Sequence, residues 1–78
     1  MSRSTSPRDD VSYDRYELSV VGLRSADESR LAERIERAPG VREVRPDADA
    51  STVELVAEGE VAVGDAEWVL ESAGYRVR

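Results

Sequence analysis

The sequence predicts an α+β sandwich in which a four-stranded antiparallel sheet carries two helices on one face. Segments with strand and helix periodicity follow one another in the order strand, helix, strand, strand, helix, strand, a βαββαβ arrangement. Glycine or proline stands at several of the junctions. Because right-handed crossovers connect such units, we expect the second and fourth strands at the edges of the sheet.

The first strand and the first helix are predicted from residue periodicity. Apolar and polar residues alternate over residues 16–21, which is typical of a half-buried strand. Leu31, Ile35 and Ala38 then recur on one face of a helix. Pro39-Gly40 is expected to end this helix, because glycine can adopt the left-handed C-terminal conformation.

Two further strands are expected in the middle of the chain. The second runs from residue 41 to about Pro46, and a proline without an amide donor is compatible with an edge strand. Residues 47–50 form a turn, and the third strand covers residues 52–57, where apolar residues again alternate with polar ones.

The C-terminal part is predicted to contain one helix and a short strand. We expect residues 59–64 to form a connection from which Val61 and Val63 reach back to the core. Apolar residues align on one helical face over residues 65–73, and residues 75–77 form the last strand.

The charge of the chain excludes one class of partner. The formal net charge is −6, and all 11 basic residues are arginine. We expect no nucleic-acid partner, because neutralising phosphates requires a basic face. Acidity with arginine in place of lysine favours a halophilic archaeon as the source, since high salt screens repulsion between carboxylates; codon bias alone is the alternative.

Domain organisation and location follow from composition. The 78 residues make one domain, predicted at residues 15–78, and the polar residues 1–14 are predicted to form a flexible N-terminal tail. There is no apolar run of about 18 residues and no secretion signal, so we expect a small soluble protein of the cytoplasm without membrane insertion.

The loop after the first strand, Gly22-Leu23-Arg24-Ser25-Ala26-Asp27-Glu28, together with Pro39-Gly40-Val41 and Gly74-Tyr75, resembles the heavy-metal-associated domain family, which includes small copper chaperones and modules of metal-pumping ATPases. The resemblance covers residues 16–78 and implies a ferredoxin-like sandwich. It also implies a loop of the form Gly-Met-x-Cys-x-x-Cys, whose two cysteines bind the metal, and it places Tyr75 near that loop.

The two cysteine positions of the family are occupied here by Ser25 and Glu28, and the chain contains neither cysteine nor histidine. Soft ions such as Cu(I) require sulfur ligands, so the degenerate site is not expected to bind them by thiolate. Leu23 is expected to keep the apolar plug. Ser25-Ala26-Asp27-Glu28 matches a capping box, which predicts reciprocal hydrogen bonds between Ser25 and Glu28 at the helix start.

These observations predict a non-enzymatic interaction or regulatory module with no cofactor, since nothing pairs carboxylates with a nucleophile, base or phosphate loop. A protein partner or self-association is possible, and Trp68, expected to face away from the core, is the candidate contact. One alternative is a small-molecule or hard-cation sensor with a candidate ligand loop of Gly22, Leu23, Arg24, Asp27 and Tyr75. Another is weak metal trafficking.

Overall fold

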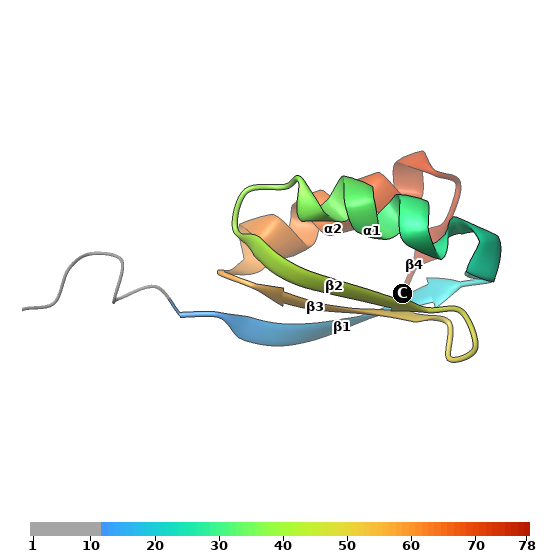
Figure 1. Ribbon diagram of the computed structural model, residues 1–78, viewed down its shortest axis with the longest axis horizontal. Helices are drawn as coiled ribbons and strands as arrows, with labels where there is room; N and C mark the ends of the chain where they lie inside the picture. The colour runs from blue at the N-terminus through green and yellow to red at the C-terminus, as the bar shows by residue number, and fades with distance from the viewer. Residues whose placement is uncertain (1–11) are drawn as a thin grey trace, which may run out of the picture.

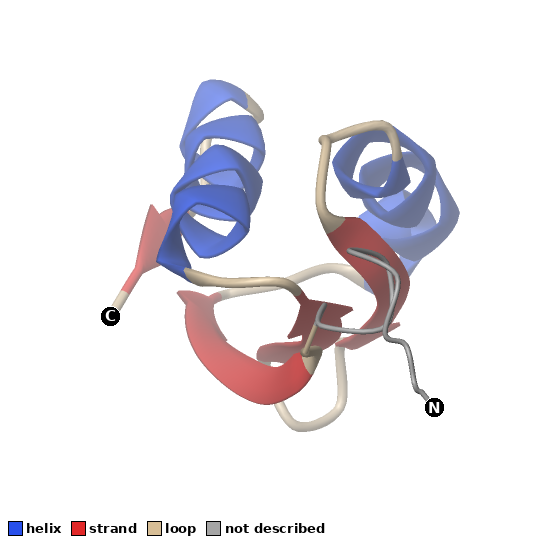
Figure 2. Ribbon diagram, turned by 90° about the vertical axis from the view of Figure 1, so that its left-hand side faces the viewer, coloured by secondary structure: helices blue, strands red, loops and turns tan. Residues whose placement is uncertain are grey.

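The computed structural model describes residues 12–78, which form a sheet covered on one face by two helices (Figures 1 and 2). The elements, in chain order, are β1 (Asp14–Val21), the 3-10 helix η2 (Ser25–Asp27), α1 (Glu28–Glu36), β2 (Val41–Asp47), β3 (Thr52–Ala57), α2 (Glu60–Ser72) and β4 (Arg76–Val77). This architecture is the predicted ferredoxin-like sandwich, and β3 has the predicted bounds.

The strand order β2-β3-β1-β4 confirms that the second and fourth strands are the edges. All three pairings are antiparallel. Pro46 lies in β2 opposite Val53, on a strand whose other side has no neighbour in the sheet. An edge strand is where a sheet tolerates proline, because only one side of the strand needs amide donors.

The core lies between the sheet and the helices. Its most deeply buried large side chains come from β1, β3 and both helices: Val20, Leu31, Ile35, Val53, Leu55 and Leu70. The alternation of β3 places Val53, Leu55 and Ala57 toward the helices, as its period-2 pattern predicts. Burial of these side chains is the main favourable term that holds so small a fold together.

The start of α2 corrects one prediction. Residues 59–64 are not a connection, because α2 begins at Glu60 and Gly64 lies inside it. Ala62 is buried and joins the core, whereas Val61 is 83% exposed and does not reach back to the core as expected. Val63 packs against the core as predicted. At the other end, Ala73 is exposed rather than buried.

The N-terminal tail was predicted at residues 1–14, and residues 1–11 lie outside the part of the chain that the structure describes. β1 begins at Asp14, one residue before the predicted domain boundary. Tyr13 directly precedes β1, and the Arg42 guanidinium lies 5.1 Å from the centre of its ring. Within residues 12–78, neither helix combines the length and apolar composition needed to cross a membrane.

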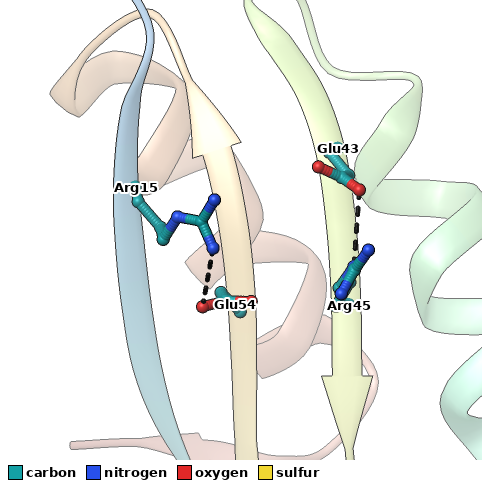
Figure 3. Close-up of polar contacts among 4 residues, drawn as sticks. All are labelled: Arg15, Glu43, Arg45 and Glu54. Atoms are coloured by element: carbon teal, nitrogen blue, oxygen red, sulfur yellow. Dashed lines mark hydrogen bonds and ion pairs between the residues drawn. The ribbon is translucent and has the colours of Figure 1, made fainter.

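The sheet face opposite the helices carries charge (Figure 3). Arg15 of β1 pairs with Glu54 of β3 at 3.5 Å, and Glu43 pairs with Arg45 along β2 at 3.4 Å. The four side chains line a hollow of about 90 Å³. Ligand pockets are usually several times larger, and exposed ion pairs contribute little to stability. This hollow is therefore too small to be a candidate ligand site.

Candidate functional site

The loop between β1 and α1 lies at the same end of the molecule as the β2–β3 turn and the C-terminal end of α2 (Figure 1). Gly22 leaves the strand with φ of 68°, a left-handed conformation that favours glycine. Leu23 then turns inward and is 5% exposed, which confirms its predicted role as an apolar plug. Arg24 is extended and exposed, and the chain enters η2 at Ser25.

The predicted capping box is wrong. Ser25 does not cap α1, because it begins η2, and α1 starts three residues later at Glu28. The residue in the N-cap position of α1 is Asp27, and its side chain makes no capping hydrogen bond. A local sequence signal has been overridden by contacts with distant parts of the chain, which engage Asp27 and Glu28 instead.

Glu28 is held by the turn between β2 and β3. Its Oε2 accepts a hydrogen bond of 2.7 Å from the backbone amide of Ala48. Glu28 and Ala48 are both partly buried. A hydrogen bond to a charged acceptor of this kind is shorter and stronger than a hydrogen bond to a neutral one. The carboxylate at the second cysteine position therefore connects the start of α1 to the sheet.

Tyr75 is placed beside the loop by the end of α2. The amide of Gly74 donates to the Glu71 carbonyl at 3.0 Å, and the amide of Tyr75 donates to the Leu70 carbonyl at 3.0 Å. With Gly74 at φ of 97°, these bonds form a Schellman motif. The helix end therefore fixes where the Tyr75 backbone lies and directs its side chain toward the loop.

The Tyr75 hydroxyl bonds to the loop. It donates to Oδ2 of Asp27 and accepts, at 3.4 Å, from the backbone amide of Arg24. Nε of Arg24 lies 3.8 Å from the same Asp27 oxygen. Arg24, Asp27 and Tyr75, which we call the Tyr75 clasp, thus join the loop to the C-terminal segment.

The clasp also affects the charge of the loop. Hydrogen bonding to Tyr75 and the proximity of Asp27 raise the pKa of the Arg24 guanidinium above its ordinary value. Arginine is charged at all physiological pH values in any case. The Arg24 guanidinium is therefore a fixed positive charge of the loop, with the Asp27 carboxylate beside it.

The donor set does not fit a soft metal ion. Thiolate sulfur is absent from the sequence, Ser25 offers only an exposed hydroxyl, and the Glu28 carboxylate is directed to the Ala48 amide. Within residues 12–78 no group of three or more acidic side chains is arranged to hold a metal ion. The carboxylates of Asp27 and Glu28 are engaged with Tyr75 and Ala48 respectively.

The structure thus brings together three of the seven residues predicted for the loop site, Arg24, Asp27 and Tyr75, whereas Glu28 bonds to Ala48 instead. Gly22 and Leu23 shape the loop, and Ser25 faces solvent. Trp68 lies elsewhere, 65% exposed on α2, as its helical phase predicts. Sequence reasoning missed Ala48, and no sequence signal identifies it, because its contribution is a backbone amide.

Comparisons with known proteins find similar folds among solved structures. No family model and no curated protein matches the sequence. Among solved structures, the chain is similar to the CsoZ metallochaperone, with a TM-score of 0.76 and 20% identity over 86% of this chain and 99% of that one. It is also similar to the N-terminal domain of a potential copper-translocating P-type ATPase from Bacillus subtilis in its Cu(I)-loaded state, with a TM-score of 0.74 and 20% identity over 86% of each chain.

A third similar structure is oxidized MerP from Ralstonia metallidurans CH34, with a TM-score of 0.71 and 20% identity over 86% of this chain and 96% of that one. At these identities the likeness establishes the fold. The chain therefore has the ferredoxin-like fold of the heavy-metal-associated domains that its loop and glycine pattern resembles, and it lacks the cysteine pair at the loop.

Proposed function

We propose that this chain is a non-enzymatic module of the heavy-metal-associated type that no longer binds soft metals through thiolates and acts by binding a protein partner. The observation that carries the proposal is the use of Glu28, at the second cysteine position, as an acceptor for the Ala48 amide. The Tyr75 clasp supports it, because Asp27 is likewise engaged inside the protein.

The fold supports the same conclusion. Its structural neighbours include the CsoZ metallochaperone and the N-terminal domain of a potential copper-translocating P-type ATPase. If the loop no longer carries a metal ion, such a domain still offers a small rigid surface. Recognition of another protein is the activity that such a surface can supply without a metal.

Competition for Cu(I) tests the metal part of this proposal. The wild-type protein and a Ser25→Cys/Glu28→Cys variant are titrated against a chromogenic Cu(I) chelator under reducing conditions. We expect the wild type to leave the metal with the chelator and the double variant to take up one Cu(I) per chain, because sulfur donors are restored on a matching scaffold. Far-UV circular dichroism checks that the variant is folded.

Sub-micromolar binding of one Cu(I) by the wild type would contradict the proposal. The same titration with Mg²⁺ and Ca²⁺, followed by amide chemical shifts of residues 24–28, tests the hard-cation alternative. Two carboxylates are too few for tight binding of these ions, so we expect only the small shifts produced by an equal ionic strength of NaCl.

A further inference from the structure

The outer side of α2 presents an apolar stripe. Val61 is 83% exposed and Trp68 is 65% exposed, and they are the two most exposed of the large apolar side chains among residues 12–78. They are seven residues apart, so they lie on the same side of the helix about 10 Å from each other along its axis. Gly64 lies between them, and an added Cβ there would have no neighbour within 4 Å. The helix backbone is therefore accessible at the middle of the stripe.

The charged residues of α2 that flank the stripe are all acids. Residues 46–75 contain eight carboxylate side chains and no arginine, although the chain has 11 arginines in total. Four of these acids lie on α2: Glu60, Asp65, Glu67 and Glu71. None of the four is in an ion pair with another residue of the described chain, where the pairs involve Glu43, Glu54 and Asp27. Within residues 12–78, no arginine therefore compensates these charges in an ion pair.

A hollow extends the stripe at its N-terminal end. It has a volume of about 340 Å³ and lies where α2 begins, against the connection from α1 to β2. Apolar atoms of Pro39, Val61 and Ala62 line it, and Glu58 and Glu60 stand beside them. Such a combination suits the aliphatic stem of a lysine or arginine side chain whose cationic end reaches a carboxylate.

We propose that this α2 surface, defined by Val61, Gly64 and Trp68 with the acids beside them, binds a basic amphipathic helix of a partner protein. An apolar side chain of the partner packs on Trp68 beside Gly64, and its lysine or arginine side chains meet the carboxylates. Charge complementarity selects this occupant over a second copy. Two copies would each carry a net charge of −6 and would oppose four uncompensated acids on each α2.

The inference rests on the proposed function, for which it supplies the surface and the class of partner. A synthetic amphipathic helical peptide of about 18 residues, with leucine on one face and lysine and arginine on the rest, is a direct probe. Trp68 is the only tryptophan of the chain, so its emission reports on this surface alone. We expect the peptide to shift that emission to the blue and to bind with micromolar affinity. A twin peptide with glutamate in place of every basic residue should do neither.

Matched variants separate a specific surface from general attraction to an acidic protein. Isothermal titration should show at least a tenfold loss of affinity for Trp68→Ser, as for a central aromatic contact, and little change for Tyr13→Ser. Glu67→Gln/Glu71→Gln should weaken binding severalfold. Glu33→Gln/Glu36→Gln makes the same change in net charge on exposed positions of α1 and should leave the affinity nearly unchanged.

Three results would overturn the proposal. One is peptide affinity that is equal for the wild type and for Trp68→Ser. Another is a blue shift of Trp68 emission that grows with protein concentration in the absence of peptide, together with self-association in sedimentation of the same samples. That result would assign the surface to a second copy. The last is a red shift of Trp68 emission on deletion of residues 1–11, which would assign the surface to the N-terminal segment of the same chain. None of these measurements involves Cu(I). The proposed loss of thiolate binding is therefore tested independently of the proposed α2 surface.

Discussion

Tyr75→Phe removes a single hydroxyl from the Tyr75 clasp and leaves the packed ring in place. That hydroxyl donates to the Asp27 carboxylate and accepts from the Arg24 amide at 3.4 Å. A hydrogen bond to a charged group contributes about 1.5–3 kcal/mol. The Asp27 side chain keeps 22% of its surface exposed, so water can replace part of the lost bond, and the Arg24 contact is long. We therefore expect a loss of about 1–2 kcal/mol in the free energy of unfolding.

Urea unfolding followed by far-UV circular dichroism measures this loss, with an unchanged dependence on denaturant as the sign that the unfolded state is unaffected. In a domain of this size, about 1.5 kcal/mol corresponds to roughly 6–12 °C in the midpoint of thermal unfolding. Tyr16→Phe is the matched control, because the Tyr16 hydroxyl makes no hydrogen bond within residues 12–78. Its free energy of unfolding should change little.

A double-mutant cycle isolates the contact from side effects. Asp27→Ala also removes the exposed Arg24–Asp27 ion pair and a negative charge near the start of α1, and the cycle cancels these common terms. We expect a coupling energy of about 1 kcal/mol or more between Tyr75→Phe and Asp27→Ala. A coupling energy below about 0.3 kcal/mol would show that the hydroxyl and the carboxylate contribute independently, and it would refute the stabilising interaction between Tyr75 and Asp27.

Two further predictions concern the scaffold around the site. Glu28→Ala removes the acceptor of the Ala48 amide and should lower the free energy of unfolding by about 1–2 kcal/mol in chemical denaturation. Glu28→Gln keeps an acceptor, and Glu33→Ala changes an exposed position of α1, so both should cost much less. Equal losses for Glu28→Ala and Glu33→Ala would contradict the assigned bond. Gly64→Ala and Gly74→Ala should have opposite signs, although an added Cβ is free of contacts at both positions. Gly64 lies inside α2, where alanine stabilises by roughly 0.5–1 kcal/mol, whereas Gly74 has φ of 97°, where a side chain costs about 1–2 kcal/mol. Thermal unfolding of both variants checks the pair, and a stabilising Gly74→Ala would refute the Schellman end of α2.

The sequence was sufficient to predict the two central strands because β1 and β3 carry a period of two. In β3, Val53, Leu55 and Ala57 fall on one face and Glu54 on the other, which indicates the buried face. The start of α2 was missed for a physical reason. Gly59 and Gly64 are typical of a connection, but Ala62 buries its side chain in the core, and this tertiary contact keeps the helix intact through Gly64.

The contacts of the loop site could not be predicted in the same way. Ser25 and Glu28 match a capping box, whose two partners are three residues apart. The bonds that form instead join Glu28 to Ala48 and Asp27 to Tyr75, across 20 and 48 residues. Local patterns do not encode contacts of that range. The resemblance to a known family did place Tyr75 near the loop, but not the hydrogen bonds that its hydroxyl makes.

Two hydrogen bonds between distant parts of the chain explain how the loop is held in place. Here one contact runs from Glu28 to the β2–β3 turn and another from Asp27 to Tyr75. They fasten the loop to the sheet on one side and to the end of α2 on the other. Hydrogen bonds between distant parts of the chain therefore hold the loop in place, and the proposal that the chain acts through its α2 surface requires no bound metal.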